Sequence, residues 1–272
     1  MLYYIKGFKK AWEVIMKNEM KRKMESGLPV VGTFFELGDP TVVECIGLSG
    51  MDFLIIDTEH GPFEVESTMN FVRAAELRNI EPLVRIKDHS RSSVLKMLDI
   101  GAKGLIIPNI ETVEQVKNLV DYGKYYPLGR RGFAPTRCGG FGFVEHAVED
   151  ISEYFNLSNE ETMIIPQCET KGCLDNIEQI VSIKGVDGIF VGPYDLSIAL
   201  GIPAQFTNPI FIESIDRILK ACKTAGKYAL IFSGSVSTAR KYLKDGFNGI
   251  AYSMDTNILI NALSNCVNEI KS

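Results

Sequence analysis

Short segments of continuously apolar residues alternate along the chain with longer segments in which apolar residues recur every three to four positions. The longer spacing is typical of helices with one buried face, whereas a short, unbroken apolar run is typical of a strand buried on both faces. We therefore predict eight strands: Pro29–Phe35, Phe53–Asp57, Pro82–Ile86, Gly104–Pro108, Met163–Cys168, Gly188–Gly192, Tyr228–Phe232 and Gly249–Tyr252.

The segments with helical spacing follow the predicted strands one by one. Asp39-Pro40 precedes the first of them, and Gly101, Gly226 and Gly246 follow others, as is usual at the starts and ends of helices. An unbroken alternation of strands and helices predicts a (β/α)8 barrel, and a doubly wound open sheet is the alternative. The predicted helices are Thr41–Ser49, Val65–Arg78, Ser90–Ile100, Val113–Tyr122, Lys171–Ser182, Pro209–Ala225, Ser235–Lys244 and Asn257–Ile270.

Residues 1–24 precede the repeat. Their apolar side chains recur at helical spacing, at Ile5, Phe8, Trp12 and Ile15. Lysines fall on the other face of the predicted helix. This pattern predicts an N-terminal helical extension that covers the bottom of the barrel domain, residues 25–272. A helix at a membrane surface, or a true start at Met20, is the alternative.

The segment between the fourth and fifth predicted strands, residues 123–161, is much longer than the other connections. It contains arginine and glycine residues at 130–132 and 137–142, followed by a predicted helix near residues 145–155. Loops of this length in compact domains usually have a function of their own, so we expect an entrance or lid here.

The overall composition excludes several classes of protein. A chain of 272 residues with 46% hydrophobic and 23% charged content is neither disordered nor collagen-like. Its net charge of -5 argues against a protein that coats nucleic acid, and no apolar run approaches the roughly 18 residues of a membrane-spanning helix. The six cysteines form no CxxC pair and no secretory signal is visible, so we expect a cytoplasmic protein with reduced, buried thiols.

Charged residues fall at the ends of several predicted strands, where a barrel would carry its active site. Glu169 and Asp195 follow the fifth and sixth strands, so both carboxylates could reach one hard cation such as Mg²⁺ or Mn²⁺. The alternative is that each caps the helix after its strand. A Schiff-base aldolase would need a lysine on a barrel strand, and none is predicted there. The nearest candidate is Lys87, just past the end of the third predicted strand.

Four further residues suggest acid–base chemistry at the same rim. Arg85 closes the third strand, where a permanent cation would stabilise a developing oxyanion. His60 follows the second strand and is a natural proton carrier near pH 7, and Asp57 could orient it. Asp99 stands at a helix C-terminus, where a carboxylate opposes the helix dipole and needs a partner, unless it is simply solvated.

Several motifs in order resemble the HpcH/HpaI aldolase family of metal-dependent pyruvate aldolases. The resemblance extends over residues 20–260, and its most specific stretch is 185–197, GVDGIFVGPYDLS. The other motifs are Val31-Gly32-Thr33, LIIDTEH at 54–60, Val84-Arg85, Leu98-Asp99-Ile100-Gly101, Gly129-Arg130-Arg131-Gly132 and Gln167-Cys168-Glu169-Thr170. Thr58 and Tyr194 depart from the family pattern, in which glycine and a small residue are common.

The resemblance implies a role for each candidate residue. It makes Glu169 and Asp195 ligands of Mg²⁺, Mn²⁺ or Co²⁺, with Gln167 beside the metal. Arg85 would stabilise the pyruvate enolate and His60 would carry protons, with Asp57 and Asp99 in support and Asp99 paired with the histidine. The backbone at Gly192, Pro193 and Tyr194 would hold the pyruvate carboxylate.

The expected activity is the cleavage or formation of a 4-hydroxy-2-oxo acid, with pyruvate and an aldehyde as its small-molecule partners. A lyase of acyl-CoA or citrate type, or a non-catalytic binding barrel, is the alternative. The last predicted helix carries an apolar stripe that would cover the eighth strand of its own chain. The family resemblance implies instead that this helix is exchanged between subunits of a hexamer, so we expect a homo-oligomer, with no nucleic-acid or membrane partner.

Overall fold

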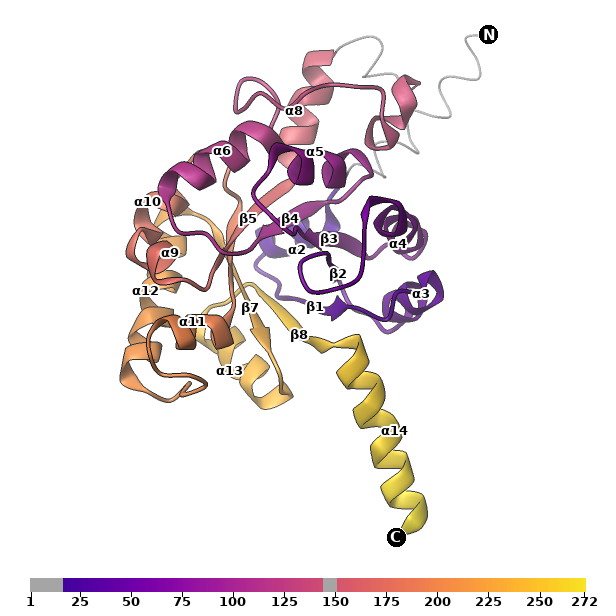
Figure 1. Cartoon of the computed structure of the whole chain (residues 1–272), viewed down its shortest axis with the longest axis vertical. Coiled ribbons are helices and arrows are strands. Elements are labelled where there is room, and N and C mark those ends of the chain that lie inside the picture. The colour runs from indigo at the N-terminus through magenta and orange to yellow at the C-terminus, as the bar shows by residue number, and fades with distance from the viewer. Residues whose placement is uncertain (1–16, 144–150) are drawn as a thin grey trace.

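The centre of the molecule is a closed barrel of eight parallel strands, seen in the computed structural model, which describes residues 17–143 and 151–272 (Figure 1). Each strand pairs with the next in the chain, and the last pairs back with the first, so the barrel prediction is confirmed and an open sheet is excluded. The strands are β1 (Val30–Phe35), β2 (Phe53–Asp57), β3 (Glu81–Arg85), β4 (Gly104–Ile107), β5 (Met163–Cys168), β6 (Gly188–Val191), β7 (Tyr228–Ser233) and β8 (Gly249–Met254).

Helices surround the barrel and begin at residues whose side chains accept backbone N–H groups. Thr112 and Gln115 form a reciprocal capping box at the start of α6, and Ser235 caps α13. The helices before the fifth strand are α2 (Glu19–Glu25), α3 (Pro40–Leu48), α4 (Val65–Leu77), α5 (Arg91–Asp99), α6 (Val113–Gly123), the 3₁₀ segment η1 (Arg137–Gly142) and α8 (Ile151–Glu161). Those after it are α9 (Lys171–Asp175), α10 (Ile177–Ser182), α11 (Pro193–Ala199), α12 (Pro209–Ala225), α13 (Val236–Asp245) and α14 (Asp255–Lys271).

Two helical predictions were wrong in detail. The segment expected as one helix over Lys171–Ser182 is two short helices, because Asn176 leaves the helical conformation and serves as the C-cap of α9 and the N-cap of α10. Helix α11 was not predicted, since Gly192-Pro193 resembles the end of a strand. Proline is in fact well suited to the first helical turn, where its missing N–H would have no partner.

The strands are continuously apolar because they separate two hydrophobic cores. On β2, Phe53 and Ile55 point into the barrel, while Leu54 and Ile56 pack against the surrounding helices. Alternation along a strand directs successive side chains to opposite faces, so a strand with a core on each face has few polar positions. The inner core fills the barrel below the site and gives the strand ends a rigid base.

Helix α2 closes the N-terminal end of the barrel. Its Met20 and Met24 are buried and belong to the inner core, and Asn18 caps the helix by accepting a hydrogen bond from the Lys21 N–H. The apolar stripe expected at positions 5, 8, 12 and 15 lies outside the described residues.

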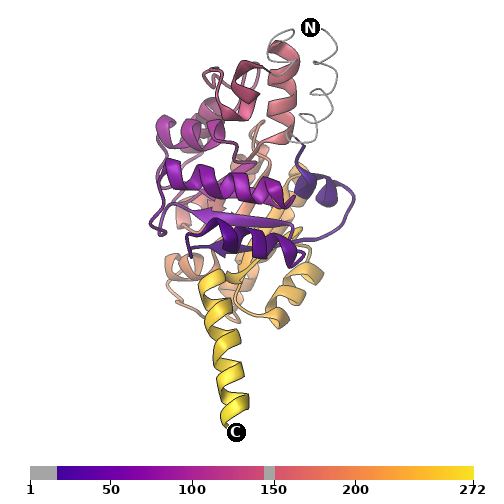
Figure 2. The same ribbon diagram turned by 90° about the vertical axis from the view of Figure 1, so that its right-hand side faces the viewer.

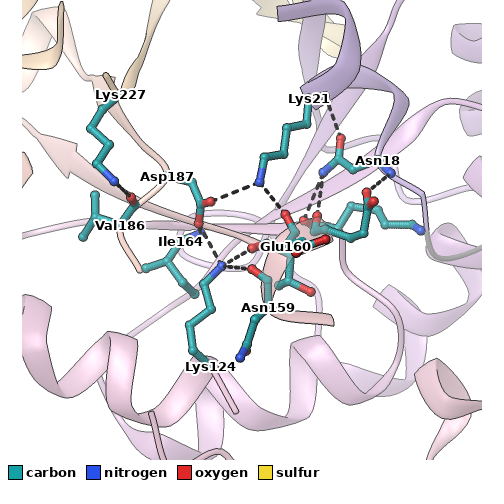
Figure 3. A network of polar contacts seen from close by, with 12 residues as sticks. Asn18, Lys21, Lys124, Asn159, Glu160, Ile164, Val186, Asp187 and Lys227 are labelled. Carbon is teal, nitrogen blue, oxygen red and sulfur yellow. Dashed lines mark hydrogen bonds and ion pairs between the residues drawn. The ribbon is translucent and has the colours of Figure 1, made fainter. Parts of the chain in front are cut away.

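A polar network ties α2 to the start of β5 and β6 (Figure 3). The buried Lys124 ammonium lies 3.0 Å from Asp187 and donates a 2.8 Å hydrogen bond to the Asn159 carbonyl. Asp187 also receives the Ile164 N–H at 2.9 Å and lies 3.5 Å from Lys21 of α2. Burial lowers the pKa of Lys124, and Asp187 opposes that shift. These contacts are at the end of the barrel opposite the strand C-termini, so they support the fold rather than the site.

The final helix, α14, leaves the barrel and projects away from it (Figures 1 and 2). The expectation that it covers the eighth strand of its own chain is wrong, because its apolar stripe is exposed to solvent. The stripe consists of Leu259, Ile260, Leu263, Val267 and Ile270.

Two expectations from composition can be compared with the structure. All six cysteines are free thiols; Cys168, Cys173 and Cys222 are buried, whereas Cys45 and Cys266 are exposed, so burial is not general. Within the described ranges, no helix combines the length and the apolar character needed to cross a membrane.

Candidate active site

The predicted site residues meet at the C-terminal end of the barrel, around a cavity of about 350 Å³. This end carries the active site in (β/α)8 enzymes, because the loops that follow the strands converge there. Seven of the ten residues expected from sequence line the cavity: His60, Arg85, Gln167, Gly192, Pro193, Tyr194 and Asp195. Asp57 and Glu169 do not line the cavity themselves but form hydrogen bonds with Arg85 and Gln167, which do. Asp99 lies away from the cavity and pairs with Arg131.

Arg85, the last residue of β3, is fixed by the last residue of β2. Its Nε and Nη2 donate hydrogen bonds of 2.9 and 2.6 Å to the two carboxylate oxygens of Asp57, which is fully buried. Neighbouring parallel strands place these two residues side by side, since Asp57 and Arg85 are register partners. The guanidinium also lies 4.8 Å from the centre of the Phe34 ring. A bidentate pair backed by an aromatic ring holds the cation in one orientation toward the cavity.

Glu169 follows β5 and its carboxylate is held by two donors. The backbone N–H of Asn109 donates a 2.7 Å hydrogen bond to Oε1, and the side-chain amide of Gln167 donates to Oε2. Gly192 is needed opposite, because a Cβ there would lie 2.9 Å from Glu169 Oε2. The side-chain carbonyl oxygen of Gln167 is buried and has no hydrogen-bond partner among the described residues.

Three carboxylates, those of Glu59, Glu169 and Asp195, concentrate negative charge at the cavity. Burial raises the pKa of Glu169, and the nearby carboxylates of Asp195 and Glu59 raise it further. Burial also raises the pKa of Glu59, which Arg85 at 3.3 Å partly offsets. In the part of the chain that the structure describes, neither Glu169 nor Asp195 makes an ion pair. Neighbouring carboxylates repel one another, so a bound cation or a proton lowers the electrostatic energy of this group.

His60 stands at the entrance of the cavity. Its side chain is 71% exposed, and its Nε2 lies 3.9 Å from Glu59. Asp57 contacts the backbone of His60 and not its ring: Asp57 Oδ1 accepts the N–H groups of Glu59 and His60 at 3.1 and 3.4 Å. Asp57 therefore fixes the loop that presents the imidazole, and the exposed imidazole lines the cavity near Glu59.

Asp99 is not part of the cavity of its own chain. It ends α5, and its carboxylate accepts a 2.9 Å hydrogen bond from Arg131, a buried residue of the long β4–β5 connection. The expected pairing of Asp99 with His60 is not made within one chain.

Sequence reasoning assigned no role to several residues that the structure places in the site. Glu36 follows β1 and lines the cavity, and Glu59 pairs with Arg85. Glu59 lies in the LIIDTEH motif, two residues after the end of β2, which is a signal that could have identified it. One side of the cavity is apolar and consists of Phe34, Phe190, Phe232 and Met254.

The arrangement suits the stabilisation of an anion next to a carboxylate cluster. A fixed guanidinium faces a cavity that contains an exposed imidazole, and both are positioned by a buried aspartate. Lys87 does not suit a Schiff base, because its half-exposed ammonium pairs with Glu64 at 3.3 Å and is not among the residues of the cavity.

The family model for HpcH/HpaI aldolase/citrate lyase matches residues 31–262. The chain belongs to this family. It is 31% identical over 264 residues to 2-keto-3-deoxy-L-rhamnonate aldolase of Salmonella paratyphi A, with 95% of each chain covered. It is similar to the solved structure of an HpcH/HpaI aldolase/citrate lyase family protein of Burkholderia cenocepacia, with a TM-score of 0.86, 30% identity, and coverage of 94% of this chain and 100% of that one. It is also similar to the solved structure of the citrate synthase SbnG, with a TM-score of 0.82, 29% identity, and coverage of 92% of this chain and 96% of that one.

The family that the motifs suggested is therefore confirmed. Relatives that match over nearly the whole chain are 2-keto-3-deoxy-L-rhamnonate aldolases, and they support an enzyme of the aldolase type, a carbon–carbon lyase, over a non-catalytic barrel. The match extends from β1 into α14, so it includes every strand end that contributes to the cavity.

Proposed function

We propose that the protein is a divalent-metal-dependent aldolase that cleaves or forms a 4-hydroxy-2-oxo acid, with pyruvate and an aldehyde as the other reactants. The observation that carries this proposal is the fixed Arg85 guanidinium beside the carboxylates of Glu169, Asp195 and Glu59 around one cavity. An arginine held on two sides stabilises an enolate oxygen without having to reorganise during the reaction.

Glu169 and Asp195 fit the role of metal ligands. Both are hard oxygen donors, and the Gln167 side-chain oxygen, which has no hydrogen-bond partner among the described residues, lines the same cavity as Asp195 and follows the same strand as Glu169. Residues 17–143 and 151–272 contain no cluster of three or more His, Cys, Asp or Glu side chains arranged around a metal. We assign the cation to the two carboxylates, which leaves room for water and substrate. When bound, Mg²⁺, Mn²⁺ or Co²⁺ supplies Lewis acidity toward the keto oxygen of a 2-oxo acid.

The residues of this chain account for the remaining requirements of the reaction. In the cleavage direction the C4 hydroxyl loses its proton, the C3–C4 bond breaks to release the aldehyde, and the electron pair stays on the pyruvate fragment. Arg85 stabilises the resulting enolate, which takes up a proton at C3 to become pyruvate. His60 carries protons at the entrance. The backbone N–H groups of Tyr194 and Asp195, in the first turn of α11 after Gly192 and Pro193, bind the pyruvate carboxylate.

We also propose that the active assembly is a homo-oligomer, a hexamer built from dimers. The exposed apolar stripe of α14 is best explained by a second copy of the chain that covers it. Asp99 and the 130–137 segment lie away from the cavity of their own chain, so they are candidates to complete the site of a neighbouring subunit.

The activity is tested with purified protein, pyruvate and a panel of aldehydes, with and without divalent cations. Formation of a 4-hydroxy-2-oxo acid only when a cation is present supports the proposal. Cleavage of citrate or an acyl-CoA thioester in place of aldol chemistry would favour the citrate-lyase activity that the family's description also includes. A pyruvate adduct on Lys87 that borohydride traps would exclude the metal-dependent mechanism.

A further inference from the structure

Glu36 is a carboxylate at the mouth of the cavity with a firmly positioned backbone. It follows the last residue of β1, and its N–H and that of Leu37 each donate a 3.0 Å hydrogen bond to the two oxygens of Asp255, the first residue of α14. Asp255 is buried, so these two bonds fix where the chain leaves the barrel. The Glu36 side chain consequently enters the cavity from a defined point on its wall.

The carboxylate of Glu36 is partly buried. Within residues 17–143 and 151–272 it makes neither a hydrogen bond nor an ion pair. Burial raises its pKa, the carboxylates of Asp57 and Asp255 raise it further, and the charges of Arg85 and His60 offset part of this. A desolvated carboxylate without donors is unfavourable by itself, and a ligand that donates a hydrogen bond would relieve the cost.

The barrel places Glu36 across the cavity from the proposed metal ligands. In the closed order of eight strands, β1 is four strands away from β5 in either direction. Glu169 follows β5 and Asp195 follows β6, whereas Glu36 is flanked by Met254 of β8 and Phe34 of β1. A 2-oxo acid whose keto and carboxylate oxygens face β5 and β6 would therefore extend its other end toward Glu36.

We propose that Glu36 determines which aldehyde is used: it accepts a hydrogen bond from a hydroxyl group on the aldehyde fragment, and it repels aldehydes that end in a carboxylate. This inference rests on the proposed aldolase function and adds the substrate class to it. A hydroxyl satisfies the unpaired oxygens, whereas a second anion would place two like charges in a partly desolvated space. Phe34 and Met254 offer a substrate carboxylate no donor, and the Arg85 guanidinium in the same cavity already pairs with Asp57 and Glu59.

The test compares two aldehydes of nearly equal size in one reaction mixture: glycolaldehyde, which carries a hydroxyl, and glyoxylate, which carries a carboxylate. A longer pair, glyceraldehyde and succinate semialdehyde, extends the probe further from the carbonyl. We expect the wild-type enzyme to favour the hydroxyl-bearing member in kcat/KM. Glu36→Gln keeps the size of the side chain and removes its charge, so the preference should fall by about tenfold or more, through a gain for the carboxylate.

A control and a second measurement make each outcome informative. Glu213→Gln changes an exposed glutamate of α12 and should leave the preference unchanged. Exchange of the pyruvate methyl protons needs no aldehyde, so it reports whether the site of each variant is folded and active. If exchange persists while Glu36→Gln leaves the preference unaltered, or if the wild type prefers the carboxylates, the role of Glu36 is overturned. If the wild type shows no exchange, the proposed aldolase function itself fails.

Discussion

Arg85 and Asp57 form a bidentate ion pair at the ends of two neighbouring strands, with hydrogen bonds of 2.9 and 2.6 Å. Burial would lower the pKa of Arg85, but the hydrogen bonds and charge of Asp57 and the charge of Glu59 raise it. The guanidinium is therefore a permanent cation in a fixed orientation. The same Asp57 carboxylate accepts the backbone N–H of His60, so one buried aspartate positions both the cation and the loop of the proton carrier.

Arg85→Ala should reduce aldol cleavage and pyruvate proton exchange together. Both reactions pass through the enolate, and the loss of one oxyanion donor typically costs about 10²–10³ in rate. Arg85→Lys should recover only part of the rate, because an ammonium cannot make the bidentate pair with Asp57. Arg78→Ala, in an arginine that pairs with Glu44 on the surface, is the control. Wild-type exchange in Arg85→Ala would contradict this role.

His60→Ala should slow proton transfer by roughly 10²–10⁴ and leave the affinity for the metal nearly unchanged. His60 lies at the entrance, and its nearest carboxylate is Glu59, not either of the proposed metal ligands. The measurements are kcat for aldol cleavage and a titration of the metal-free protein with Mn²⁺. His89→Ala is the matched control, since His89 contacts the carbonyl of Pro108 at 2.6 Å and does not line the cavity. Loss of Mn²⁺ binding in His60→Ala would show that the histidine is a ligand.

Tyr125→Phe should make the protein less sensitive to alkaline pH. Burial raises the pKa of Tyr125 to about 12, whereas the phenol of an unfolded chain ionises near 10. The stabilisation is therefore fully present below pH 10 and is lost as the pH rises toward 12. The variant keeps the ring that stacks on Phe155 at 4.3 Å and removes this loss, on the order of 2 kcal/mol in the free energy of unfolding.

Denaturant unfolding measured between pH 9 and pH 12 checks this expectation. Tyr126→Phe is the neighbouring control, because that side chain is 78% exposed. Equal slopes of stability against pH in the wild type and Tyr125→Phe would be inconsistent with a raised phenol pKa.

The apolar stripe of α14 should hold subunits together. Replacing Leu259, Leu263 and Val267 with glutamine removes apolar side chains that the chain itself leaves exposed, so the fold of the barrel should persist while the assembly dissociates. Sedimentation should give several times 30.2 kDa for the wild type and about 30.2 kDa, with reduced activity, for the variant. Asn261→Ala and Asn265→Ala on the same helix are controls. A fully active wild-type monomer would refute both the assembly and the shared site.

Much of the fold and the site could be predicted because the relevant signals are local. Each strand is an unbroken apolar run with a core on both faces, and Asp57, Arg85, Gln167 and Glu169 stand at or just past a strand end. Strand ends in a barrel converge, so position in sequence translated directly into position in space.

The remaining features depend on contacts between distant segments. Asp99 meets Arg131 only because the long β4–β5 connection folds back on α5, and no periodicity encodes that contact. Glu36 follows an ordinary strand, and its place in the cavity depends on Asp255 of the last helix. Periodicity alone favoured packing of α14 on its own barrel, because an apolar stripe fits a barrel wall and a partner subunit equally well; only the family resemblance implied an exchanged helix.

Exchange of the pyruvate methyl protons with deuterium, followed by NMR, tests the central claim most directly, because it needs neither the natural aldehyde nor the natural direction of the reaction. The protein is stripped of metal by a chelator, dialysed, and supplied with Mg²⁺, Mn²⁺ or Co²⁺ in turn. Glu169→Gln and Asp195→Asn are measured beside the wild type. We predict no exchange in the stripped wild type, recovery with at least one cation, and no recovery in either variant. Full exchange in the stripped protein, or undiminished recovery in both variants, would contradict a metal-dependent pyruvate aldolase with these two ligands.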